Sequence, residues 1–158
     1  MAKNNLFIFL IVITLCSCFT DQIQQSGECR AINLQCEYLQ NPIGIDVLNP
    51  RLSWELMSEE KDKSQSGYKI LVASTLELLH DNKGDLWETD KVLSSQSIHI
   101  PYDSKILKSR QQCYWKVMVW DEKGGVSDWS EAALWEMSLL DENDWTASWI
   151  EAPRIYQW

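Results

Sequence analysis

The sequence predicts an all-β domain, a sandwich of two sheets built from seven short strands. Three observations indicate this class. Apolar and polar side chains alternate with a period of two in several segments, turn-forming residues separate those segments at regular intervals, and no convincing helix is present. A strand that alternates in this way buries one face, and two such sheets packed face to face share a single core.

An aromatic-rich hairpin over residues 112–137 is the most informative element. Its first strand divides its side chains between two faces, with Cys113, Trp115, Val117 and Val119 on one and Tyr114, Lys116, Met118 and Trp120 on the other. Residues 121–125 supply a turn, because two glycines there are free to take a positive φ. A second aromatic-rich strand closes the hairpin. Large aromatics on both faces are typical of a small β-sandwich rather than of an enzyme active site.

Strands are also predicted before this hairpin. Residues 31–39 form the first, and residues 51–56 the second, with Leu52, Trp54 and Leu56 on its buried face. The polar, charged residues 59–66 are predicted to form a solvated hairpin loop.

The third predicted strand covers residues 67–74 and turns Tyr68, Ile70 and Val72 to one side. Residues 75–80 favour one helical turn, since Thr75 and Glu77 are placed as an N-terminal cap. Residues 86–92 and 96–100 are two further short strands. With the hairpin this makes seven, the number typical of an immunoglobulin-like sandwich.

The order of these strands resembles a fibronectin type III domain, although the Cys…Trp…Cys spacing of antibody domains is absent. In that family the sixth strand carries a tyrosine that makes a corner hydrogen bond. Here the alternating series begins at Leu107 and places Cys113 at the tyrosine position, so the sequence does not secure that bond.

The start of the chain is predicted to be an export signal. Lys3 precedes an apolar run of about ten residues, too short for a membrane-spanning helix, which needs about 20. The run ends in Leu15-Cys16-Ser17-Cys18, which resembles a bacterial lipobox and makes Cys18 the candidate lipidation site. The alternative is an ordinary signal peptide cleaved near the same place. We expect residues 1–17 to be the signal peptide, residues 18–30 a polar tether, and the protein to be exported to the periplasm or anchored as an outer-membrane lipoprotein.

Composition narrows the remaining function classes. A net charge of −9 argues against nucleic acid and anionic membrane as partners, so membrane contact is expected only through the lipid anchor. Cys29, Cys36 and Cys113 match no zinc or redox spacing, and the two histidines are isolated, so neither metal nor cofactor is expected. Cys36 and Cys113 are predicted to be buried, and the odd number leaves at least one thiol unpaired.

The predicted sandwich spans residues 31–140, and the sequence then changes character. Residues 141–144 are acidic and predicted to be a solvated linker, and their carboxylates are not taken as a catalytic cluster. From Trp145 a new extended segment begins. Residues 141–158 are therefore expected to be a linker and the first strand of a truncated further β-sandwich domain.

Several motifs, read in order, resemble one family. They are LQCEYLQNPIGID (34–46), PRLSW (50–54), GYKILVAS (67–74), DLWETD (85–90), YWKV (114–117), SDWSE (127–131), WEM (135–137) and DWTASWI (144–150). Their order and spacing resemble the N-terminal region of bacterial α-L-rhamnosidases of glycoside hydrolase family 78. The resemblance implies a fibronectin-III-like domain that precedes further β-sandwich domains and a catalytic helical barrel. It implies an inverting parent enzyme, which needs two carboxyl groups about 6.5–9.5 Å apart. The barrel is absent from this sequence, so no catalytic residue is assigned and this chain alone is expected to be inactive.

The sequence contains nine tryptophans, which suggest sugar binding because aromatic faces stack on pyranose rings. Trp54, Trp115 and Trp135 are expected in the core, whereas Trp87, Trp120 and Trp129 are candidates for a sugar or interdomain contact. Trp129 lies in a Ser-Asp-Trp-Ser motif that resembles the Trp-Ser repeats of cytokine-receptor domains, in which basic side chains pack on the ring. That resemblance makes Lys116 the expected partner of Trp129.

Three functions compete at this point. The leading one is a non-catalytic N-terminal module of an exported rhamnosidase, a spacer and docking domain whose partners are the downstream domains. The second is a surface-anchored carbohydrate-binding module for rhamnose-containing glycans, and the third is a protein-adhesion module.

Overall fold

A computed structural model describes residues 29–148 and residue 150. The predicted signal peptide, the lipidation candidate Cys18 and most of the tether lie outside the described residues, as do Trp149 and residues 151–158. Among the described residues no helix is long and apolar enough to cross a bilayer.

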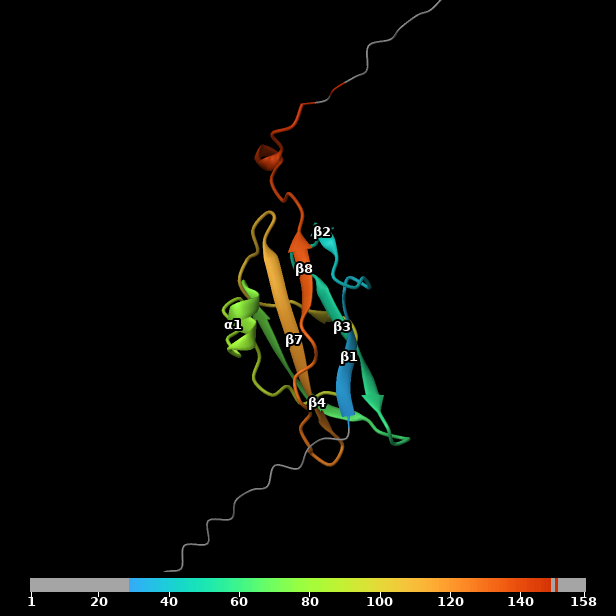
Figure 1. Cartoon of the computed structure of the whole chain (residues 1–158). Helices are drawn as coiled ribbons and strands as arrows, with labels where there is room; N and C mark the ends of the chain where they lie inside the picture. Colours follow the sequence, from blue (N-terminus) through green and yellow to red (C-terminus); the bar gives the residue numbers. More distant parts are fainter. Residues whose placement is uncertain (1–28, 149, 151–158) are drawn as a thin grey trace, which may run out of the picture.

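Two sheets pack against each other, which confirms the predicted immunoglobulin-like β-sandwich (Figure 1). One sheet has the order β1-β3-β6 and comprises Cys29–Cys36, Arg51–Ser58 and Ile100–Pro101. The other has the order β2-β8-β7-β4-β5 and comprises Ile43–Ile45, Ala133–Met137, Gln112–Asp121, Gln65–Ala73 and Trp87–Glu88. The predicted helical turn is present as α1, Leu76–His80, with the Thr75 hydroxyl accepting a hydrogen bond from the Leu78 amide at 3.3 Å.

The core is formed by the residues that the alternation of apolar and polar side chains predicted to be buried. Trp54, Trp115 and Trp135 are each at most 2% exposed, and Ile70 and Val72 are fully buried beside them. Trp135 makes edge-on contacts with Trp115 and with Tyr102, at centroid distances of 6.4 and 5.8 Å. Cys36 and Cys113 are buried, as predicted, and both are free thiols; burial raises the pKa of each to about 12. The centre of the sandwich is thus a dry aromatic cluster.

Tyr102 provides the loop hydrogen bonds that Cys113 does not. Its buried hydroxyl donates to the Lys105 carbonyl at 2.9 Å, with the Leu86 carbonyl 3.3 Å away. Because the Leu86 carbonyl lies just before β5 and the Lys105 carbonyl lies in the loop before β7, this side chain joins the two connecting segments.

One prediction about a connection was wrong, and one strand was not predicted. Residues 59–66 do not close a hairpin: β3 and β4 belong to different sheets, and Gln65 is already buried in β4, where it accepts a hydrogen bond from the indole of Trp54 at 2.9 Å. The connection after β1 contains an unpredicted strand, β2, which pairs in parallel with β8. The strands expected at 86–92 and 96–100 are reduced to two residues each, β5 and β6.

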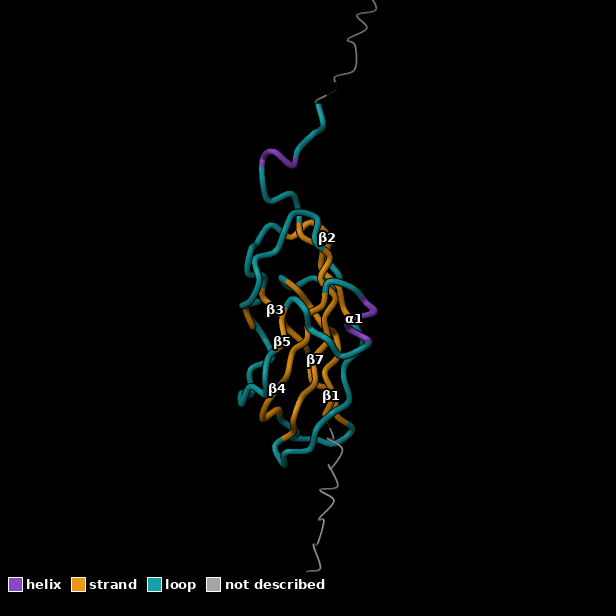
Figure 2. Tube along the Cα trace, turned by 90° about the vertical axis from the view of Figure 1, so that its left-hand side faces the viewer, coloured by secondary structure: helices purple, strands orange, loops and turns teal. Residues whose placement is uncertain are grey.

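The described chain starts and leaves at opposite ends of the long axis of the sandwich (Figures 1 and 2). β1 begins at the end where β7 finishes, and the segment after β8 departs from the other end. We call the first the entry end and the second the exit end.

Candidate functional site

The three candidate tryptophans do not share a face. Val72 pairs with both Trp87 and Trp115, so Trp87 lies on the inner face of the five-stranded sheet. It packs edge-on against Tyr102 at a centroid distance of 5.4 Å. Trp120 is one of the alternate residues of β7 that face outward, and Trp129 packs on the outer cluster formed by Leu71, Ala73 and Leu79. An outer site could therefore use Trp120 and Trp129 but not Trp87.

The Ser-Asp-Trp-Ser motif runs along β7, and its two serines each make two hydrogen bonds to that strand. Ser127 donates its amide to the Val119 carbonyl at 2.9 Å, and its hydroxyl accepts from the Val119 amide at 3.0 Å. Ser130 repeats both bonds with Val117, at 2.8 and 3.0 Å. Serine hydroxyls thus supply acceptors where a regular strand would use carbonyl oxygens, and their three-residue spacing matches alternate residues of β7.

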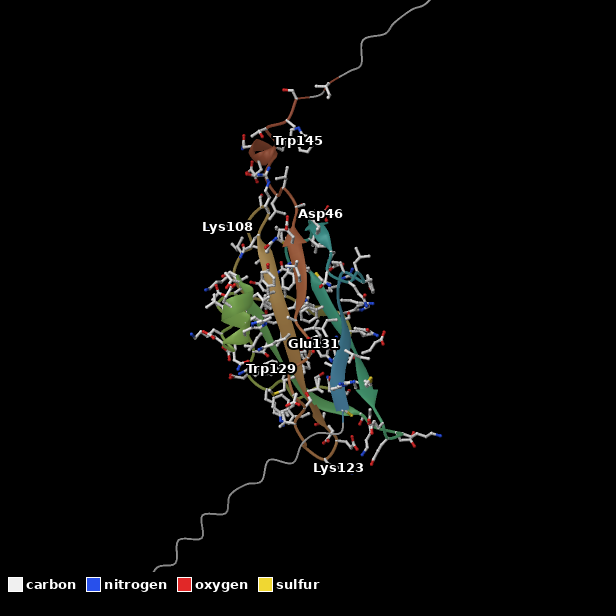
Figure 3. The ribbon with its side chains drawn as sticks, viewed as in Figure 1. Asp46, Lys108, Lys123, Trp129, Glu131 and Trp145 are labelled. Carbon is white, nitrogen blue, oxygen red and sulfur yellow. The ribbon has the colours of Figure 1, made fainter. Side chains whose placement is uncertain are left out.

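This arrangement directs Trp129 outward over Lys116. The Lys116 ammonium lies 4.9 Å from the centroid of the indole, which confirms the pairing that the motif resemblance predicted. The same ammonium donates to the Leu79 carbonyl at 2.7 Å and to Asn82 Oδ1 at 2.6 Å. Lys116 is 7% exposed, and desolvation lowers its pKa. The four groups form a clamp that joins β7, the motif and the end of α1, and we call it the lysine clamp. Figure 3 labels its Trp129.

Trp120 also makes a cation–π contact, with a different lysine. The Lys91 ammonium lies 4.6 Å from its ring centroid. Sequence reasoning missed this contact because Lys91 lies in the connection after β5, far along the chain from Trp120 in β7. One face of each outer indole is thus occupied by an ammonium group. These contacts favour packing roles for both rings.

A groove of about 670 Å³ lies between β1 and the motif segment. Its walls combine the apolar residues Ala31, Ile32 and Met57 with Trp129. Its rim carries charged residues, namely Arg30, Glu59, Glu60, Asp128 and Glu131. Aromatic and carboxylate groups are the kinds of side chain that bind neutral sugars, so the groove is the natural place to test for glycan binding.

Among the described residues, the carboxyl groups with a shifted pKa are shifted away from the value that acid catalysis needs. Glu37 is held by Arg51 through contacts of 2.6 to 3.3 Å, and these hydrogen bonds lower its pKa. The pKa values of Glu77 and Glu122 are also lowered, in each case first by a backbone hydrogen bond. A glycosidase general acid needs a raised pKa. Within residues 29–148 and 150, no three His, Cys, Asp or Glu side chains are grouped to hold a metal ion.

The acidic stretch after the sandwich is an ordered turn. Glu142–Asp144 forms a 3-10 helix, and Asp141 and Asp144 complete a capping box around it. Ser109, in the loop before β7, donates to the Asp144 carboxylate and accepts from the Leu140 amide at 2.8 Å. The segment predicted to be a solvated linker is therefore attached to the sandwich.

Comparison with known proteins identifies the family. Residues 31–141 match the model of the Rha78A-like N-terminal immunoglobulin domain. The chain belongs to this family. The resemblance read from the motifs is confirmed, and the Rha78A-like domain coincides with the two sheets described above.

Relatives extend far beyond this domain. An α-L-rhamnosidase of Formosa agariphila is 41% identical over 153 residues, which are 94% of this chain and 16% of the relative. A solved α-L-rhamnosidase structure from Dictyoglumus thermophilum is 41% identical with a TM-score of 0.73, covering 77% of this chain and 14% of that one. The α-L-rhamnosidase of Streptomyces avermitilis, solved in complex with L-rhamnose, is 40% identical with a TM-score of 0.74, covering 79% and 12%. This chain thus spans about an eighth to a sixth of the length of these relatives.

Proposed function

We propose that the Rha78A-like domain is the non-catalytic N-terminal module of a longer α-L-rhamnosidase. The observation that carries this proposal is the family match over residues 31–141, together with alignment to only 12–16% of the α-L-rhamnosidases it resembles. The reaction proposed for the parent is inverting hydrolysis of terminal α-L-rhamnosides. Its two carboxyl groups would belong to the part of the relatives outside the region that this chain matches, since the shifted carboxyl pKa values among the described residues are lowered rather than raised.

In the proposal the module acts as a spacer between the cell surface and the catalytic region. The placement of the two ends supports this role, because a chain that starts at one end of the long axis and leaves at the other separates what it connects. The apolar run before Leu15-Cys16-Ser17-Cys18 supports export, with Cys18 as the anchor. The downstream domains of the same polypeptide are the proposed partners.

The test is an activity assay on the purified chain with an aryl α-L-rhamnoside, with the Streptomyces avermitilis enzyme as positive control. We expect no turnover by the chain. Hydrolysis that copurifies with this chain and persists at constant specific activity would overturn the proposal.

Carbohydrate binding is a second candidate, favoured by the groove between β1 and the motif segment. Sugar hydroxyls would donate to the rim carboxylates while a ring lies against the apolar wall. Isothermal titration with rhamnose-containing glycans decides the matter, with Glu131→Gln as the variant and Glu88→Gln, on β5 and outside the groove, as its control. Absence of heat at millimolar sugar would eliminate this candidate.

A further inference from the structure

The exit end of the sandwich exposes several large apolar side chains. They are Ile43, Val47, Leu48, Ile106 and Trp145, with exposed fractions of 77, 43, 57, 90 and 58%. Leu139, Leu140 and Trp145 also line a shallow concavity of about 450 Å³. We call these residues the exit patch. Figure 3 shows Asp46 and Lys108 on either side of the departing chain, with Trp145 beyond them.

Hydrogen bonds hold the three segments that carry the patch together. β2 is joined to the end of β8 by the Ser138 amide, which donates to the Ile45 carbonyl at 2.8 Å. The Arg110 amide donates to the Ser138 carbonyl at 3.0 Å, which brings the loop before β7 to the same place. The patch is therefore built on fixed backbone.

The direction in which the chain leaves is fixed as well. Ser109 bonds to the Leu140 amide and to the Asp144 carboxylate, and the Asp141 capping box closes the turn between them. Whatever follows Trp145 therefore starts beside the patch rather than at the end of a free tether.

The entry end differs in its connecting loops. Its two connecting loops, residues 59–64 and 121–125, are mostly charged, and the Lys63 ammonium pairs there with Glu60 at 3.0 Å and Glu122 at 3.3 Å. Single exposed apolar residues are normal on a protein surface, whereas a group of them at one place marks an interaction site. The asymmetry between the ends singles out the exit end.

We propose that the exit patch is the docking surface for the folded domain that follows this module in the longer rhamnosidase chain, and that this domain covers it with apolar side chains. The inference rests on the proposed function and adds to it the surface through which the module contacts the domain that follows. Two observations select this occupant over a second copy of the chain. The relatives are much longer than this chain and their matching domain is N-terminal, and the fixed exit gives the next domain a high effective concentration at the patch.

The experiment uses the full 158-residue chain joined to the part of the Formosa agariphila enzyme that follows its matched region. Limited proteolysis of residues 139–148 is timed for this fusion and for its Leu48→Asp/Ile106→Asp variant. Undocking exposes the junction, so we expect cleavage at least about tenfold faster in the variant. The matched control is Leu93→Asp, which changes a 79% exposed leucine near the entry end, next to Ser94, whose carbonyl accepts from Gln65 at 3.1 Å. The control should be cleaved at the rate of the parent fusion.

Equal cleavage of the double variant and the parent fusion would overturn docking. Sedimentation of the unfused chain checks the occupant: a dimer that the double substitution dissociates, with no change in the fusion, would assign the patch to a second copy and overturn the proposal. Far-ultraviolet dichroism of the unfused variants checks folding, and Leu48→Ser/Ile106→Ser replaces the aspartates if they unfold it. Rhamnoside hydrolysis by the unfused chain would refute the proposed function separately, without changing the proteolysis result.

Discussion

On its inner face β7 presents Trp115 to a core that excludes water, whereas on its outer face it presents Lys116 to three polar or aromatic partners. The indole N–H groups of Trp115 and Trp135 are buried without an acceptor among the described residues. Each such donor costs about 1–3 kcal/mol, which the burial of the large ring has to offset. The side chains on the inner face of β7 are therefore stabilised mainly by buried apolar area, whereas Lys116 on the outer face adds charge-assisted hydrogen bonds. Substitutions on the two faces should therefore lower the free energy of unfolding by different amounts. Loss of a polar contact should also make the free energy of unfolding depend on pH in a way that loss of a core contact does not.

Trp135→Ala should have the largest effect. The ring is fully buried between Trp115 and Tyr102, so its removal should lower the free energy of unfolding by about 3–5 kcal/mol, measured by urea denaturation. Trp135→Phe removes an indole N–H that has no acceptor and keeps a ring, and should cost less than half as much. A loss below about 1 kcal/mol for Trp135→Ala would contradict a core held by apolar area.

Lys116→Met should have the next largest effect. It keeps the apolar part of the side chain but removes the ammonium, and it should cost about 1.5–3 kcal/mol because hydrogen bonds to charged groups are lost. Tryptophan fluorescence should change at the same time, since the ammonium no longer lies over Trp129. The matched control is Lys83→Met, whose ion pair with Asp81 is largely exposed and should contribute less than about 0.5 kcal/mol. If Lys116→Met and Lys83→Met lost equal free energy of unfolding, the lysine clamp would contribute nothing to stability beyond an exposed ion pair.

Ser127→Ala tests the serine acceptors of the motif. The hydroxyl accepts from the buried Val119 amide, and its loss should cost about 1–2 kcal/mol and speed hydrogen exchange at that amide. Ser130→Ala should cost less, about 1 kcal/mol, because its bond to the Val117 amide is only part-buried. Ser95→Ala, at an exposed position, is the control. Unchanged exchange at Val119 would mean that the hydroxyl is not its acceptor in solution.

Glu37→Gln should have the smallest effect and the clearest dependence on pH. Hydrogen bonds from Arg51 lower the pKa of Glu37 below its ordinary value of 4.5, so the unfolded chain binds the proton more tightly than the folded one. The stability from this pair is therefore fully present above pH 4.5 and is lost as the pH falls through the lower, folded pKa. Above pH 4.5 the variant should lose about 1 kcal/mol or less, because Arg51 is partly exposed. The difference from wild type should shrink towards acid. A constant difference from pH 7 to pH 2 would contradict this assignment.

Alternation along the chain was sufficient to predict the core, because Trp54, Trp115 and Trp135 each occupy the buried face of a half-buried strand. The partnership of Lys116 with Trp129 was also predictable, from the resemblance of a four-residue motif. β2 was not, because three residues carry no periodicity and its partner β8 lies about ninety residues further along the chain. The charged loop at 59–66 is equally compatible with a hairpin and with a crossing between sheets. The two are distinguished by the pairing of β3 with β1 and β6, which leaves no edge for β4. The attachment of Asp144 to Ser109 depends on residues 35 apart in sequence and left no local signal.

The parallel pairing of β2 with β8 has a mechanical consequence. The Glu136 amide donates to the Pro42 carbonyl at 2.9 Å, and the Ser138 amide to the Ile45 carbonyl at 2.8 Å. A pull between Cys29 and the departing chain would draw these two strands in opposite directions along their length. Both bonds would then be loaded in shear and would have to break together, so this short pair would resist extension along with the longer pairing of β1 with β3.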